Sequence, residues 1–125
     1  MEKEKLSELN WQTFQGRKLL KMFEMTIDIQ NEITRLMGEM STKCDNLPWA
    51  LGELLLDTKK VLENIEKVQA RLDIIQVRIS ENKQLICEDL FVNLWESMTE
   101  QNNVARLGME NLHEVLMRMK EKEGI

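Results

Sequence analysis

The chain has 125 residues and a formal net charge of −5; 42% of its residues are apolar and 31% are charged. This length suits one folded domain and is short for two, and the apolar fraction is too high for a disordered chain. The densest basic cluster, Arg17, Lys18 and Lys21, is too short to follow a phosphate backbone, so we expect no nucleic-acid partner.

The residue types favour helices along the whole chain. The sequence has one Pro, no Tyr and only five Gly, and runs of β-branched residues bounded by turn residues are missing. We therefore predict an all-α fold: an elongated antiparallel three-helix bundle with coiled-coil-like spacing. It forms a single domain over residues 1–125, with helices at about 3–42, 48–80 and 84–121.

The first predicted helix carries an apolar stripe of moderate regularity. Its positions are Leu19, Met22, Thr26, Ile29, Ile33, Leu36 and Met40, and Trp11 and Phe14 extend it toward the N-terminus. The polar segment STKCDNLP at 41–48 combines cap-forming residues with a proline. This segment predicts the turn that ends the helix.

The second predicted helix begins at Pro48 and has the clearest pattern in the chain. Its stripe is Leu51, Leu54, Thr58, Val61, Ile65, Val68, Leu72, Ile75 and Ile79. These positions alternate between spacings of three and four without a miss, which is typical of one long helix face. Leu55, Leu62, Ile74 and Val77 broaden the face. We therefore expect this helix to contact two or more neighbours.

The third predicted helix is harder to phase. If the second stripe continued, it would reach the polar residues Asn82, Asp89 and Asn93. A new phase fits better, with positions Ile86, Leu90, Leu94 and Met98 and then Ala105, Met109, Leu112, Leu116 and Met119. The shift indicates either a turn near 80–84 or one long helix with a stutter. An unbroken helix from 48 to 120 would be roughly 110 Å long, so we favour three helices of similar length.

Residues 87–98, CEDLFVNLWESM, carry only acidic charges beside two aromatic residues, and two interpretations stand. In the first, the acids form a solvated face and the apolar residues are core: Leu90, Phe91, Leu94 and Met98. In the second, the segment is an exposed docking surface for a basic, apolar helix, formed by Trp95, Glu88, Asp89 and Glu96. Stripe residues are usually core, which favours the first interpretation for Phe91 and Leu94. Trp95 lies beside the predicted stripe, and both interpretations remain open for it.

Three consecutive helices joined by short turns place the first and third parallel. One end of the bundle should then gather Trp11, Phe14, Phe91 and Trp95. The other end should gather Trp49, Met37, Met40, Met117 and Met119. The same geometry predicts that Arg17, Lys18 and Lys21 come level with Glu96 and Glu100.

Side chains for catalysis or metal binding are sparse. His113 is the only histidine and has no second imidazole four residues away. Cys44 and Cys87 form no CxxC motif, and the adjacent Glu88 and Asp89 point to different helix faces. A glycine-rich phosphate loop is missing. We therefore expect no enzyme, no catalytic residues, no cofactor and no metal.

These features favour a structural or interaction protein, a helical assembly subunit or adaptor that binds partner helices through Met-rich and aromatic faces. Nine methionines suit adaptable apolar surfaces, although they also fill cores. The candidate partner-binding residues are Phe91, Trp95, Met98, Glu88 and Glu96 at one end and Trp49 and Met117 at the other. The expected partners are helical proteins, in a homo-oligomer or a hetero-oligomer.

The start MEKEKLSEL has no apolar stretch of the signal-peptide type, and no apolar run reaches membrane-spanning length. We expect an intracellular protein, cytoplasmic or nuclear, that does not insert into membranes. Two alternatives remain. The first is a carrier of a small apolar ligand in the bundle interior. The second is a secreted short-chain helical signalling protein with Cys44 and Cys87 as its disulfide.

Overall fold

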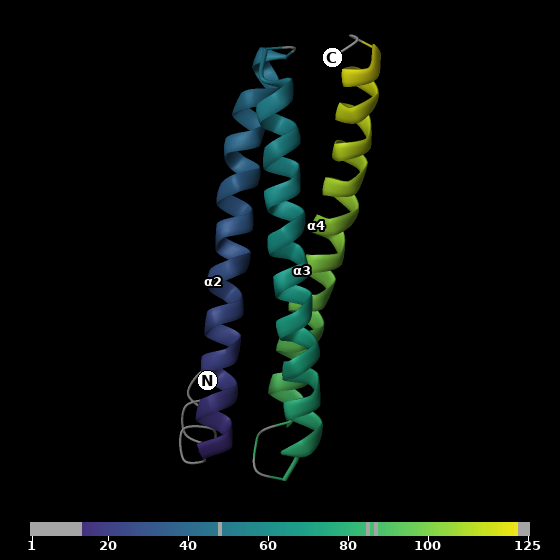
Figure 1. Ribbon diagram of the computed structural model, residues 1–125. Helices are drawn as coiled ribbons and strands as arrows, with labels where there is room; N and C mark the ends of the chain where they lie inside the picture. Colours follow the sequence, from purple (N-terminus) through teal and green to yellow (C-terminus); the bar gives the residue numbers. More distant parts are fainter. Residues whose placement is uncertain (1–13, 48, 85, 87, 123–125) are drawn as a thin grey trace.

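The computed structural model describes residues 14–47, 49–84, 86 and 88–122, and these residues form three long helices with no strand among them. Helix α2 spans Phe14–Lys43, α3 spans Leu51–Glu81 and α4 spans Glu88–Lys122; a 3-10 turn, η1, spans Cys44–Asn46. The helices run antiparallel in chain order, which confirms the predicted elongated three-helix bundle (Figure 1). The 31 residues of α3 extend about 46 Å.

The chain turns between α3 and α4, so the two are separate helices. Asn82 closes α3: its backbone N–H donates to the carbonyl of Ile79 at 3.3 Å, and its side-chain amide donates to the carbonyl of Arg78 at 2.7 Å. These bonds satisfy carbonyl groups that the end of a helix would otherwise leave without partners. An amide side chain thus helps to end α3 where the sequence offers neither Gly nor Pro.

Helix α3 packs against both other helices, and α2 and α4 also contact each other. The rings of Phe23 and Phe91 stack with centroids 5.7 Å apart, and the side-chain amide of Gln30 donates to the carbonyl of Met98 at 3.3 Å. In each pair the two residues are 68 positions apart in the sequence, and this offset defines the register of the parallel helices α2 and α4.

This register corrects the prediction for the basic cluster of α2. Glu96 and Glu100 lie level with residues 28 and 32 of α2, whereas Arg17, Lys18 and Lys21 lie roughly two to four turns below them. The prediction was wrong because it matched the two helices by their order from the chain ends. The actual register is the one at which Phe23 stacks on Phe91 and Gln30 bonds to Met98.

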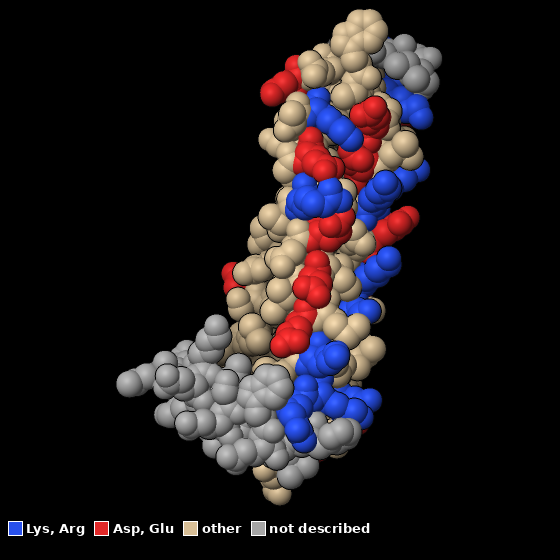
Figure 2. Space-filling view, turned by 90° about the vertical axis from the view of Figure 1, so that its left-hand side faces the viewer, with Lys and Arg blue, Asp and Glu red and all other residues tan. Residues whose placement is uncertain are grey.

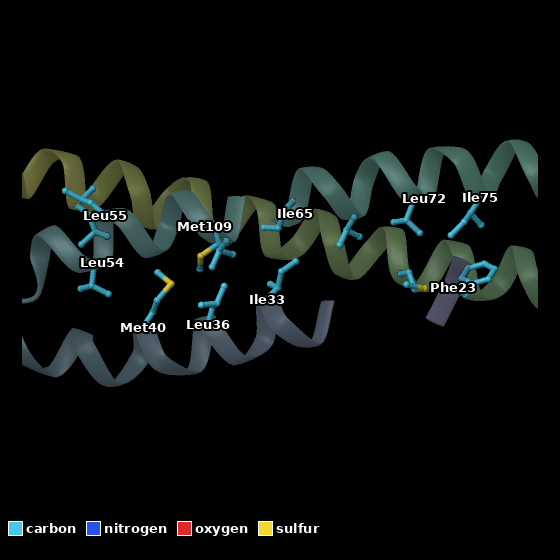
Figure 3. Close-up of a cluster of buried hydrophobic side chains, with 14 of the residues drawn as sticks. Phe23, Ile33, Leu36, Met40, Leu54, Leu55, Ile65, Leu72, Ile75 and Met109 are labelled. Atoms are coloured by element: carbon cyan, nitrogen blue, oxygen red, sulfur yellow. The ribbon is translucent and has the colours of Figure 1, made fainter. Parts of the chain in front are cut away.

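The core lies along one face of each helix (Figure 3). In α3 all nine predicted stripe positions are buried, together with Leu55. In α2 five predicted positions are buried: Leu19, Thr26, Ile33, Leu36 and Met40. Met22 and Ile29 are only partly buried, and Phe23, which was not predicted, is 1% exposed. At this level of α2 the ring of Phe23 is buried in the core, and the neighbouring Met22 lies at its edge.

The stripe of α4 includes the predicted positions Met98, Ala105, Met109, Leu112, Leu116 and Met119, but before Met98 it runs through Phe91 and Trp95 instead of Leu90 and Leu94. Its fully buried positions are Phe91, Met98, Asn102, Met109 and Leu116, with Trp95, Ala105, Leu112 and Met119 partly exposed or boundary positions between them. Spacings of three and four alternate from Phe91 to Met119 without a break. The expectation that Trp95 lies beside the stripe was therefore wrong. Trp95 and Asn102 obscured the pattern because both carry polar groups, and those groups bond to α3.

The space-filling view from the α2 side shows acidic and basic side chains along the whole length of the molecule (Figure 2). Two ion pairs on the surface of α2 join residues of the same helix: Arg35 bonds to both Glu32 and Glu39. Such exposed pairs contribute little to stability and keep the surface solvated.

None of the described helices contains a stretch apolar and long enough to cross a lipid bilayer.

Candidate partner-binding groove

Three of the predicted partner-binding residues are occupied within the chain. Phe91 is fully buried against Phe23, and Met98 is 3% exposed. The indole N–H of Trp95 donates to the carbonyl of Leu72 at 2.7 Å, and the ring packs against the core. These side chains hold α4 to its neighbours and offer little surface to another protein.

The two predicted acids lie on the outer side of the same region. Glu88 stands in the first turn of α4 and is partly buried, whereas Glu96 is exposed one turn beyond Phe91 and Val92. A carboxylate in the first turn stabilises a helix because it faces the positive end of the helix dipole. The fold thus gives Glu88 a structural role.

Trp49 and Met117, the predicted residues at the other end, come together along a groove of about 480 Å³. The groove lies between the start of α3 and the last turns of α4, at the upper end of the bundle in Figure 1. We call it the Trp49 groove. Its lining residues are Trp49, Leu51, Gly52, Leu55, Leu56, Lys59, His113, Met117 and Lys120.

The groove combines a buried floor with an exposed apolar rim. Leu51 and Leu55 are 3% and 8% exposed and belong to the core. Trp49 is 92% exposed and Leu56 is 63% exposed. Leu54, Leu55 and Leu56 are consecutive, so α3 carries apolar side chains around more of its circumference here than its stripe requires. The excess apolar surface faces the groove.

The polar groups of the groove are cationic or neutral. His113 Nδ1 lies 3.0 Å from the hydroxyl of buried Thr58, and that hydroxyl donates its one proton to the carbonyl of Leu55 at 2.8 Å. Thr58 engages Nδ1, so Nε2 is the ring nitrogen that this hydrogen bond leaves available to another partner. Lys59 and Lys120 line the groove, and no carboxylate does.

Two smaller hollows lie elsewhere on the bundle. One of about 120 Å³ separates the start of α2 from the end of α3, and one of about 80 Å³ lies between α2 and α4. Asn102 lines the second hollow; its amide nitrogen donates to the carbonyl of Ile65 at 3.2 Å, while its buried Oδ1 has no partner. This space suits water better than a protein side chain.

Within the described residues, no group of three or more His, Cys, Asp or Glu could hold a metal ion.

Sequence reasoning found Trp49 and Met117 but missed most of the groove around them. Gly52, Lys59, His113 and Lys120 were not assigned to a site, because their common surface depends on how α3 and α4 cross. The run of Leu54, Leu55 and Leu56 was the one signal in the sequence.

No protein-family model matches the chain, and no curated protein or solved structure matches it either.

Proposed function

We propose that this chain is a non-enzymatic helical assembly subunit or adaptor of an intracellular complex, and that it binds a partner helix in the Trp49 groove. One observation carries the proposal: Trp49, Leu56 and Met117 gather exposed apolar surface along a single groove. Isolated exposed apolar residues are common on proteins, but a contiguous patch beside a groove is typical of an interaction site.

The dimensions of the groove suit a helix. From Leu51 to Lys59 its α3 wall extends about 12 Å, which matches the two turns over which amphipathic helices place their anchor residues. Trp contributes large binding energies at interfaces when a partner covers it. Met117 adds a flexible side chain that adapts to different apolar surfaces.

A carrier of a small apolar ligand is supported less well. Sites for small ligands enclose most of the ligand surface. The Trp49 groove instead lies on the surface, and its rim residues Trp49 and Leu56 are exposed. In the interior, Val61, Ile65 and Val68 are each fully buried by neighbouring side chains. Ligand binding there would require the core to open.

The secreted alternative depends on a disulfide that the fold does not favour. Cys44 is exposed with a free thiol in η1 at the upper end, and Cys87 lies outside the described residues. Glu88 begins α4 at the lower end, separated from η1 by about the length of α3. A disulfide requires Cα atoms within about 7 Å.

Site-directed photocrosslinking tests the proposed function. A photoreactive phenylalanine analogue replaces Leu56 in the groove or, as a control, Ile74, which is 51% exposed on the same helix. In extracts of cells that express the protein, we expect discrete protein adducts from position 56 and few from position 74. Trp49→Glu should remove the adducts without unfolding the chain. Equal yields at both positions, or adducts that survive Trp49→Glu, would contradict the proposal.

A further inference from the structure

We infer that the helix bound in the Trp49 groove is acidic, with carboxylates on both sides of its apolar face. This inference rests on the proposed function and adds the chemistry of the partner. The chain as a whole carries a net charge of −5, yet the residues that line the groove include Lys59, Lys120 and His113 and no acid. The lining therefore holds two lysines and no carboxylate, although the chain as a whole is acidic.

The acids near the start of α3 are directed toward α2 and do not contact the groove lysines. Glu53 and Asp57 both reach toward Lys43 of α2, with N–O distances of 3.5 and 2.7 Å. In the part of the chain that the structure describes, neither Lys59 nor Lys120 has an ion-pair partner. Their charges are available to a bound molecule.

The two lysines stand on opposite walls and at different heights. Lys59 follows Thr58, which contacts His113, so Lys59 lies close to the level of His113. Lys120 lies seven residues beyond His113 on α4, about 10 Å further along the axis. A helix along the groove would meet the lysines with carboxylates on opposite flanks, about two turns apart. Between them it would place apolar side chains against Leu56 and Met117.

Gly52 gives the partner room to approach. A Cβ built on Gly52 would meet nothing within 4 Å, although Gly in a helix costs about 1 kcal/mol relative to Ala. The surface of the groove wall at Gly52 is therefore open and carries no side chain that a partner would have to displace. An occupant with a continuous backbone, such as a helix, can use this space.

Two matched peptides test the inference. Each is an amphipathic helix of about 18 residues with the same Leu-rich face, and its flanks carry either Glu or Lys. Anisotropy of a dye on the peptide measures binding to the intact chain at low salt. We expect the Glu peptide to bind about tenfold tighter than the Lys peptide, and the difference to shrink at high salt.

Charge-reversed chains provide the controls. Lys59→Glu with Lys120→Glu should reverse the preference, whereas Lys67→Glu with Lys83→Glu changes the net charge equally outside the groove and should preserve it. Circular dichroism establishes that each variant remains helical. Equal affinity for both peptides, abolished by Trp49→Glu, would overturn the acidic partner but leave the groove as a helix site.

Other outcomes separate the two proposals further. If neither peptide binds, the proposed function fails and the inference fails with it; binding of laurate in that case would identify a carrier. If light scattering shows a dimer that Trp49→Glu dissociates, the occupant is a second copy, and the acidic-partner inference is wrong.

Discussion

At the scale of single residues, α4 is held in register by side-chain N–H groups that donate to carbonyls of α3. Trp95 bonds to the carbonyl of Leu72, and Asn102 bonds to that of Ile65. The two donors are seven residues apart on α4, and the two acceptors are seven residues apart on α3. The later donor bonds to the earlier acceptor, as antiparallel helices require. Sliding α4 by one turn would break both bonds and leave buried polar groups without partners, at a cost of about 1–3 kcal/mol each.

Replacing Trp95 with Phe should test this role. The substitution keeps an aromatic ring in the core but removes the N–H that Leu72 accepts at 2.7 Å. We expect the free energy of unfolding, measured with urea, to fall by about 0.5–2 kcal/mol. Trp49→Phe is the matched control; because Trp49 is 92% exposed, it should change stability by less than about 0.5 kcal/mol. Equal effects of the two substitutions would contradict a structural role for Trp95.

These two residues also show why the stripe of α4 could not be read fully from the sequence. Hydropathy patterns locate residues that are buried because they are apolar. Asn102 is 2% exposed and Trp95 is on the stripe because each completes a hydrogen bond across the interface. The acceptors of these hydrogen bonds are carbonyl groups of α3. The spacing of residues within α4 therefore cannot reveal them.

At the scale of helices, the sequence predicts α3 best because α3 has neighbours on two sides. All of its stripe residues are apolar except Thr58, whose hydroxyl bonds to the carbonyl of Leu55. The pattern is therefore complete in the sequence itself. The end of α3 was ambiguous since Asn82 closes it by hydrogen bonding, without the Gly or Pro that usually marks a turn.

The corner between α2 and α3 should respond to pH through Lys43. Its Nζ donates to the Asp57 carboxylate at 2.7 Å, and this bond raises the pKa of Lys43 above its ordinary value. The folded chain therefore retains the proton to higher pH than the unfolded chain. The resulting stabilisation is present below the unfolded pKa, near 10.5, and is lost as the pH rises through the folded pKa.

Urea unfolding at about pH 8 and about pH 11 measures this effect. We expect the native chain to lose more stability between the two values than Lys43→Met, which lacks the titrating group. Lys67→Met removes an exposed lysine that has no such bond and should follow the native chain. The same pH dependence in Lys43→Met and the native chain would show that the bond to Asp57 does not stabilise the corner.

At the scale of the whole molecule, the sequence could place residues at an end of the bundle but could not define a surface. Trp49 and Met117 were expected at the same end, and they line one groove. Lys59 and Lys120 join them only because the antiparallel register of α3 and α4 brings them to the same groove. That two lysines and no carboxylate line the groove is therefore a property of the assembled bundle, although the chain is acidic overall.

The closure of three helices into one bundle depends on the contact between α2 and α4, and Phe23 and Phe91 make its stacked aromatic pair. A double-mutant cycle with Phe→Leu at each position should give a coupling energy of about 0.5–1.5 kcal/mol in urea unfolding. Phe23 and Leu116 lie far apart along the bundle, so Phe23→Leu and Leu116→Ala should be additive within about 0.5 kcal/mol. Zero coupling between Phe23 and Phe91 would mean that the stacked rings stabilise the bundle only through the contacts that each makes with other core residues. The hydrogen bond from Gln30 to the carbonyl of Met98 would then be the remaining link between α2 and α4 to test.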